Sequence, residues 1–214
     1  MQHNAAVNAV GLADLLVVPR GPRLPVRAWT ALLRRLPPAE QHRIQQLHRW
    51  EDRQDSAIGW GSLLRMAGQY RVSVRRGAHG GPVADPPVAL SLSHGGGWIA
   101  VAVNVHGRVG VDVEAERPVA PALARRCCST AELTWLERAA DAQTRDERFL
   151  RLWTAKEAYL KAIGTGLGVD PRSVSIDWAT SGLRLSSPEK DRWHLWSSAP
   201  ADGVRVTVCL ERAL

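Results

Sequence analysis

The sequence has few cysteines, few lysines and no long hydrophobic run. Its 214 residues include three cysteines, without the spacing of a disulfide framework or of a zinc site. This usage indicates a reducing, cytoplasmic compartment. No stretch reaches the length of about 20 apolar residues that a membrane-spanning helix needs, so we expect no membrane association. The mildly apolar residues 5–18 contain Asn8 and Asp14 and follow no basic residue, which favours a strand over a signal peptide.

The basic charge is carried almost entirely by arginine, since the chain has 28 Lys+Arg and only three of them are lysines. The net charge of +7 is uneven. Residues 1–106 hold 12 basic against 6 acidic side chains (+6), and residues 107–214 hold 16 against 15 (+1). A basic half indicates a polyanionic partner, which can be a phosphorylated cofactor, a nucleic acid or an acidic protein.

The order of hydrophobic patterns predicts an α+β protein made of two similar α/β halves, residues 1–106 and 107–214. Helices are expected near 29–36, from 39 onward, at 56–67, at 120–140 with a break at Ser129-Thr130, and at 149–164. Strands are expected near 15–18, 88–94, 98–103, 108–114, 193–198 and 203–211. The strands 98–103 and 108–114 are expected to pair as a hairpin across the turn Asn104–Gly107.

The segment Phe149–Gly164 combines an apolar helical stripe with charge. Leu152, Trp153, Leu160 and Ile163 recur at helical spacing. Lys156 interrupts this stripe, Glu157 lies beside it, and Lys161 follows Glu157 by one turn. Two of the three lysines of the chain are here, which hints at a need for a compact ammonium group. A solvated Glu157–Lys161 pair that only steadies the helix is an equally good interpretation of this segment alone.

The strand Val109–Glu114 carries two carboxylates on one face. Side chains alternate along a strand, so Asp112 and Glu114 project to the same side, roughly 7 Å apart at their Cα atoms. The neighbouring charges repel each other, and no basic residue on that face compensates them. Carboxylates of this kind suit Mg²⁺, which takes hard oxygen ligands. For one strand alone, a half-exposed polar face is the simpler explanation.

Three motifs together resemble the signature of the 4′-phosphopantetheinyl transferases of the surfactin-synthetase-activating (Sfp-like), long type. They are S-L-S-H at Ser91–His94, G-V-D-V-E at Gly110–Glu114, and W-T-A-K-E-A-Y-L-K at Trp153–Lys161. The Gly164–Leu167 segment that follows also looks like this family. Order and spacing agree as well as residue type, and the resemblance covers most of the chain.

The resemblance implies an enzyme, a holo-[acyl-carrier-protein] synthase or 4′-phosphopantetheinyl transferase. Such enzymes move the phosphopantetheine arm of coenzyme A onto a serine of an acyl- or peptidyl-carrier protein and release adenosine 3′,5′-bisphosphate. The carrier proteins of the family serve polyketide, nonribosomal peptide, siderophore or fatty-acid synthesis. It also implies a monomer whose two halves are related by pseudo-twofold symmetry, with the active site in the cleft between them. The N-terminal half would be the side of the CoA phosphates, and the C-terminal half would hold the metal site and the lysine helix.

Site residues follow by position in the motifs. The resemblance implies Mg²⁺ ligands at Asp112, Glu114 and Glu157. Glu157 is the candidate acceptor of the serine proton, and Lys161 would stabilise or protonate the leaving bisphosphate. Residues expected to contact the CoA phosphates are Ser93, His94, Lys156, Lys161, Arg53 and Arg75.

The chain departs from the family at three basic positions. The loop before S-L-S-H has Gly80-Gly81-Pro82, where a basic residue commonly precedes the proline, so Arg75 or Arg76 would have to replace it. Ser56 and Thr165 also stand where a basic residue is frequent, and Arg53 is a possible replacement for the charge missing at Ser56.

Three alternatives remain open. A nucleic-acid-binding protein would use the basic charge, but the nine tryptophans are scattered and form no basic–aromatic stacking platform. A Mg²⁺-dependent phosphohydrolase or nuclease would explain the carboxylates but not the paired lysines with S-L-S-H. A catalytically silent member of the transferase family would explain the missing charge at Gly81.

Overall fold

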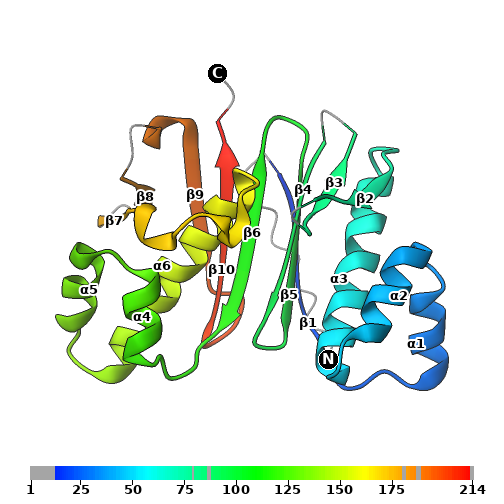
Figure 1. The fold of residues 1–214 in the computed structure, drawn as a ribbon, viewed down its shortest axis with the longest axis horizontal. Coiled ribbons are helices and arrows are strands. Elements are labelled where there is room, and N and C mark those ends of the chain that lie inside the picture. Colours follow the sequence, from blue (N-terminus) through cyan, green and yellow to red (C-terminus); the bar gives the residue numbers. More distant parts are fainter. Residues whose placement is uncertain (1–12, 79, 86–87, 180–181, 187–188, 213–214) are drawn as a thin grey trace.

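The computed structural model describes residues 13–212 apart from 79, 86–87, 180–181 and 187–188. It is a mixed α/β structure in which two small sheets lie back to back and helices cover their outer faces (Figure 1). The first part of the apolar segment 5–18 lies outside the described residues, and the rest forms the strand that the sequence predicts. None of the described helices is long and apolar enough to cross a bilayer.

The N-terminal half contains an antiparallel sheet in the order β1-β5-β4. These strands are β1 (Asp14–Pro19), β4 (Ala89–Gly95) and β5 (Trp98–Asn104). Helix α3 (Trp50–Gly68) packs on this sheet, with α1 (Val26–Leu33) and α2 (Pro38–Gln46) outside it. A short hairpin, β2 (Val74–Arg76) and β3 (Pro82–Ala84), precedes β4. The odd positions of β5, from Ile99 to Val103, and Trp60 and Leu63 of α3 form the buried core between helix and sheet.

The C-terminal half contains an antiparallel sheet in the order β6-β10-β9. Its strands are β6 (Val109–Ala115), β9 (Trp193–Ser198) and β10 (Val204–Glu211). The long helix α6 (Ala142–Ala162) packs on this sheet. Around it lie α4 (Pro121–Cys127), α5 (Thr130–Glu137), the hairpin of β7 (Ile176–Ala179) and β8 (Gly182–Leu185), and the short 3₁₀ helices η1 (Gly166–Gly168), η2 (Pro171–Ser173) and η3 (Lys190–Arg192).

A layer of small and branched side chains joins the two sheets. Val17, Ala100 and Ala102 come from the first sheet, and valines of β6 and β10 come from the second. Every one of these side chains is fully or almost fully buried. The alternation along β6 therefore sends Val109, Val111 and Val113 to the inter-sheet layer, and leaves Asp112 on the face that meets α6.

The predicted hairpin between residues 98–103 and 108–114 is wrong. Strand β5 pairs with β1 and β4, whereas β6 pairs with β10 across the chain. The hairpin in this region is β4–β5, closed at Gly96 and Gly97, both of which have a positive φ. An alternating run of valines predicts a strand with one buried face, but it does not predict which strand will pair with it. The runs in β5 and β6 could each have paired with any strand that buries a similar apolar face.

The same strand order recurs in both halves. In each, an initial strand (β1 or β6) is followed by helices and then by a hairpin (β4–β5 or β9–β10), and the last strand lies in the middle of its sheet. This recurrence agrees with the idea of two similar halves. The pseudo-twofold relation and the boundary at residues 106 and 107 stay predictions.

Candidate functional site

Three elements that are far apart in the sequence meet at a hydrogen-bonded trio. Ser93 of β4 donates its hydroxyl to Asp112 Oδ1 of β6 at 2.7 Å. Lys161 of α6 donates its ammonium to the same Asp112 oxygen at 2.7 Å and to Ser93 Oγ at 2.9 Å. The trio joins one motif from each of the three segments that carry the resemblance. Its two buried members, Ser93 and Asp112, are at most 6% exposed.

The trio depends on a close approach between α6 and β6. A Cβ atom on Gly110 would overlap the Ala158 carbonyl and stand 2.5 Å from the Ala162 nitrogen. Glycine is therefore required where the helix backbone rests on the strand. Two residues further along the same face, Asp112 comes within reach of Lys161.

Two more carboxylates surround the trio. Glu157 Oε2 lies 3.8 Å from the Lys161 ammonium. Glu114 lies against the β4–β5 turn, so close that a Cβ on Gly95 would stand 2.7 Å from its Oε2. Burial is the main reason that the pKa of Glu114 and that of Glu157 lie above the ordinary value, and the charge of Asp112 raises both further. Lys161 lowers both pKa values in part. The site thus concentrates acids around one lysine.

The donor set fits a divalent cation in chemistry. Asp112 Oδ2 is buried and has no hydrogen-bond partner among the described residues, so this oxygen is free to accept a ligand. Asp112, Glu114 and Glu157 would supply hard oxygen ligands from β6 and α6. Within the described part of the chain, no three acidic, histidine or cysteine side chains are already grouped as metal ligands. Binding of a metal would therefore need a rearrangement of the carboxylates around Lys161.

A basic cavity opens beside the trio, with a volume of about 260 Å³. Its wall includes Lys161, Ser93 and His94 from the trio side, together with Ser56, Trp60 and the backbone of Gly80 and Gly81. Arg43 and Arg76 complete it. Both guanidinium groups bind the buried Glu40, at 3.0 and 2.7 Å, and Arg76 also stacks over the Trp60 ring. Burial alone would raise the pKa of Glu40, but Arg76 and Arg43 lower it below the ordinary value. Glu40 is therefore ionised, and its carboxylate holds the two guanidinium groups in place.

His94 lies at the exposed side of this cavity. Partial removal of water around its ring is the first cause of a pKa below 6.5, and the Lys161 cation is the second. This shift favours the neutral ring, which donates one hydrogen bond and accepts another. An approaching phosphate would favour its protonated form.

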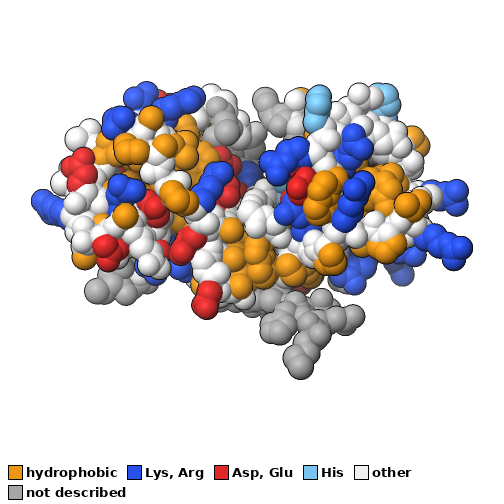
Figure 2. Space-filling view, turned by 90° about the horizontal axis from the view of Figure 1, so that it is seen from below, with side chains coloured by type: hydrophobic (Ala, Val, Ile, Leu, Met, Phe, Trp, Pro, Cys, Tyr) orange, Lys and Arg blue, Asp and Glu red, His pale blue; other side chains and the backbone are white. Residues whose placement is uncertain are grey.

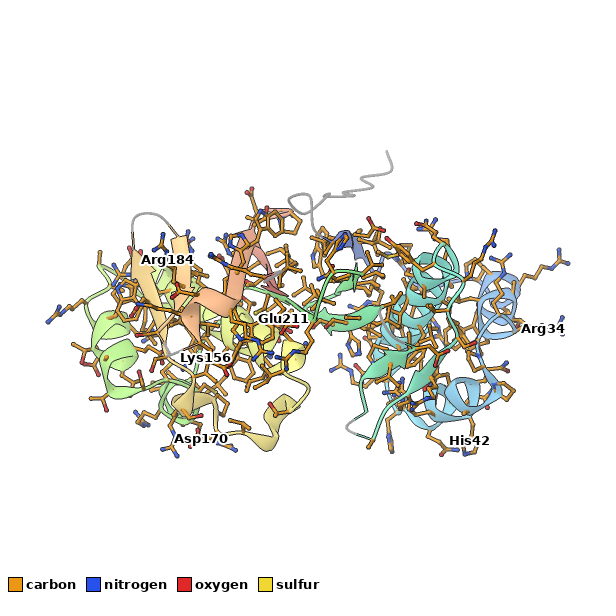
Figure 3. All side chains as sticks on the ribbon, turned by 90° about the horizontal axis from the view of Figure 1, so that it is seen from above. Arg34, His42, Lys156, Asp170, Arg184 and Glu211 are labelled. Carbon is orange, nitrogen blue, oxygen red and sulfur yellow. The ribbon has the colours of Figure 1, made fainter. Side chains whose placement is uncertain are left out.

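Lys156 does not reach this site, which corrects the prediction that it contacts the CoA phosphates. Its side chain is fully buried in the C-terminal half (Figure 3), and its ammonium is 2.6 Å from Glu132 Oε2. The same ammonium donates to the carbonyl oxygens of Cys127 and Pro171, both at 2.9 Å. A lysine with three acceptors and no exposure has no donor left for a ligand.

Two predicted arginines also lie elsewhere. Arg53 donates to the Leu47 carbonyl and lines a different cavity, and Arg75 is exposed on β2 without a place in the basic cavity. Arg76, the alternative to Arg75, is the one at the cavity. Alternation explains the difference, because successive residues of β2 point to opposite faces. Arg43 was missed, although its spacing of three residues from Glu40 was a signal for an ion pair on one helix face.

The comparisons with known proteins agree with the motifs. The family model of the 4′-phosphopantetheinyl transferase superfamily matches residues 108–209, which include β6, α6 and β10. The 4′-phosphopantetheinyl transferase gsp of Aneurinibacillus migulanus is 32% identical over 103 residues, covering 48% of this chain and 43% of that protein. The human L-aminoadipate-semialdehyde dehydrogenase-phosphopantetheinyl transferase is 24% identical over 192 residues, covering 80% of this chain and 62% of that protein.

A solved structure, the holo-[acyl-carrier-protein] synthase of Thermotoga maritima, matches with a TM-score of 0.40 and 26% identity, over 49% of this chain and 63% of that chain. The chain spans about two fifths to three fifths of the length of the curated relatives named above. The resemblance inferred from the motifs is confirmed over residues 108–209, which match the model of the 4′-phosphopantetheinyl transferase superfamily.

Proposed function

We propose that this protein transfers the 4′-phosphopantetheine arm of coenzyme A to a serine hydroxyl of an acyl- or peptidyl-carrier protein. The observation that carries the proposal is the Ser93–Asp112–Lys161 trio at the edge of a basic cavity. This arrangement places the Lys161 cation and the acidic cluster around it next to a cavity that Arg43 and Arg76 line. The family of residues 108–209 supports the same reaction.

The basic cavity is the proposed binding place of the CoA phosphates. Arg43 and Arg76 would bind phosphate oxygens with guanidinium groups that Glu40 already orients. Ser93, His94 and the Gly80–Gly81 backbone would add hydrogen bonds. Arg76 supplies the positive charge that the family commonly places next to the proline of this loop, which counts against a catalytically silent member.

Asp112, Glu114 and Glu157 are the proposed holders of Mg²⁺. The metal would neutralise the pyrophosphate and act as a Lewis acid on it. Lys161, positioned by Asp112 and Ser93, would stabilise the charge that develops on the leaving bisphosphate. Glu157, whose carboxylate lies 3.8 Å from the Lys161 ammonium, would accept the serine proton. The serine oxygen–phosphorus bond forms while the bond from phosphorus to the bisphosphate oxygen breaks.

We also propose that the two halves are related by pseudo-twofold symmetry and that CoA binds in the cleft between them. Recurrence of the strand order supports the duplication. We further propose a monomer that works in a reducing, cytoplasmic compartment, in line with three free and buried cysteines.

Release of adenosine 3′,5′-bisphosphate tests the proposal against its main alternative. The protein is incubated with CoA and Mg²⁺, with and without apo-carrier protein, and the nucleotide products are separated by chromatography. A transferase releases bisphosphate only when the apo-carrier is present. Release without the carrier would instead identify a phosphohydrolase, and no release with any of several carriers would overturn the proposal.

A further inference from the structure

A second cavity, of about 180 Å³, lies on the N-terminal half outside the proposed CoA site. Its floor is apolar and comes from Leu24, Val26, Trp29 and Trp50, and its polar wall comes from Arg23, Arg53 and Gln54. Val26 is 79% exposed, and it is the one large hydrophobic side chain so exposed among the described residues. Val26 is continuous with the half-buried Leu24, Trp29 and Trp50, and an apolar surface bordered in this way by arginines is a candidate contact for another molecule.

The wall of this cavity is rigidly built. Gln54, which is 2% exposed, donates its amide to the carbonyls of Arg20 and Pro22 and accepts from the Leu24 amide at 2.8 Å. These three bonds fix the loop 20–24 on helix α3. A buried glutamine with all these partners fixes the loop backbone in one conformation. The cavity therefore exists before any partner arrives.

Two guanidinium groups at this cavity remain uncompensated. Arg23 stacks over the Trp50 ring at 6.0 Å, and Arg53 donates to a backbone carbonyl, but neither forms an ion pair with a described carboxylate. By contrast, Arg20 is paired with Asp55, and Arg49 with Glu51. On the face of the N-terminal half seen in Figure 2, basic side chains stand among hydrophobic ones. A partner that places an acidic side chain next to an apolar one is complementary to this surface.

Helix α3 and the β4–β5 turn connect this cavity to the proposed active site. Trp50 and Arg53 lie on the same helix, α3, as Ser56 and Trp60 of the basic cavity, so the two cavities are roughly 10 Å apart along the helix. The Arg20 amide donates to the Gly97 carbonyl of the β4–β5 turn at 2.8 Å. Two residues earlier, a Cβ on Gly95 would stand 2.7 Å from Glu114 Oε2, so this hairpin lies against the Glu114 carboxylate. A protein seated on the second cavity would thus lie beside the acidic cluster.

We propose that this cavity docks the acceptor protein, by binding an acidic, amphipathic segment of the carrier while its serine enters the site. The inference rests on the proposed function and assigns the partner a surface and a chemistry. A nucleobase is a poorer occupant, because guanidinium groups of Arg20 and Arg23 already stand over the Trp50 ring. Burial of Val26 by a partner side chain and pairing of Arg23 with a carboxylate would both add to affinity.

Steady-state kinetics of bisphosphate release, at varied apo-carrier concentration, test this docking surface. The variants are Arg23→Glu and Val26→Asp. Arg34→Glu is the matched control, since Arg34 is an exposed arginine at the outer end of the same half (Figure 3) and receives the same charge change. We expect both cavity variants to raise KM for the carrier at least about tenfold, while kcat and KM for CoA keep their wild-type values. Circular dichroism and calorimetric CoA binding confirm that the fold is intact.

The outcomes separate the two proposals. If the wild-type protein releases bisphosphate and the cavity variants show the same carrier KM as Arg34→Glu, only the docking surface is overturned. If the variants weaken CoA binding instead, the cavity belongs to the nucleotide and the docking proposal is wrong. If the wild-type protein transfers nothing, the proposed function itself fails.

Discussion

At the scale of a residue, the two lysines of α6 show that the position on the helix decides whether a charge faces the site or the protein interior. Lys161 is about a quarter exposed and faces Asp112 and Ser93, so its charge is available to a ligand in the basic cavity. Lys156 lies five residues earlier and therefore on a different face of the helix. There it binds Glu132, which also accepts from the amides of Ser129 and Ile176. One buried ion pair thus connects α4, α5, α6, η2 and β7.

Replacement of Lys156 with Met is expected to lower the free energy of unfolding by about 3–5 kcal/mol, because it leaves the Glu132 carboxylate buried without its cation. Urea unfolding followed by tryptophan fluorescence measures the loss. Lys190→Met, the same change at an exposed lysine, should stay within about 0.5 kcal/mol of the wild type. The double variant Lys156→Met/Glu132→Gln should recover part of the loss. A stability of Lys156→Met equal to that of the control would show that the pair is not structural.

Replacement of Asp112 with Asn keeps the shape of the side chain but removes its charge. We expect the transfer rate to fall by about 100-fold or more, since the Asn oxygen cannot hold a cation or orient Lys161 as a carboxylate does. The rate is followed by bisphosphate release. Asp202→Asn, an exposed aspartate in the turn before β10, should keep the wild-type rate. A fully active Asp112→Asn would remove Asp112 from the proposed metal site.

At the scale of elements, the contact between α6 and β6 brings the site together. Gly110 lets the helix backbone rest directly on the strand, and the Asp112–Lys161 bond forms two residues further along. The trio is therefore sensitive to changes that never touch it. On the other side of the molecule, α3 supplies residues to both cavities, and its buried Asp55 is bound to Arg20 of the adjoining loop.

Gly110→Ala should lower the free energy of unfolding by about 1–3 kcal/mol or more, because the new methyl group meets helix backbone that cannot rotate away. The same change should slow the transfer. Urea unfolding and bisphosphate release measure the two effects. Gly68→Ala is the matched control at the end of α3, where a Cβ meets no atom within 4 Å. That control should be neutral or slightly stabilising. Equal behaviour of the two variants would contradict the tight α6–β6 contact.

Asp55 is expected to give the protein a measurable pH dependence. Burial is the main cause that raises its pKa to about 6, against about 3.9 in an unfolded chain. The folded protein keeps this proton at higher pH than the unfolded chain does, so the free energy of unfolding falls as pH rises from about 4 to 6. Asp55→Asn should lack this fall and be about 1–3 kcal/mol more stable than the wild type at pH 7.5. Urea unfolding at pH 4.5, 6 and 7.5 gives the free energy of unfolding of both proteins. If that free energy changed with pH in the same way in the wild type and in Asp55→Asn, the assignment would be refuted.

The sequence predicted elements better than their pairing. Helix α6, the helix that begins at Pro38 and the strands on either side of Gly96 follow from periodicity and from proline and glycine positions. The partner of β6 did not follow, since β10 lies about a hundred residues further along the chain. For the site, motif spacing found Ser93, Asp112 and Lys161, which meet in one trio. It could not tell Arg76 from Arg75, or Lys156 from Lys161, because which face is buried depends on the packed structure.

At the scale of the whole molecule, two sheets share one buried layer while the chemistry collects along one edge of it. Ser93 of the first sheet and Asp112 of the second sheet touch directly, so the site needs both halves. Basic side chains come mainly from the N-terminal half and the acidic cluster from the C-terminal half. This division suits a reaction in which one half holds phosphates and the other acts on them.

The most direct test of the central claim is the intact mass of a carrier protein after incubation with this protein, CoA and Mg²⁺. The account predicts that an apo-carrier gains the mass of one phosphopantetheine group, and that a carrier with its acceptor serine changed to alanine gains nothing. Omission of Mg²⁺, or use of Asp112→Asn, should remove or strongly reduce the adduct. Unchanged masses for several acyl- and peptidyl-carrier proteins with the folded wild-type protein would contradict the account.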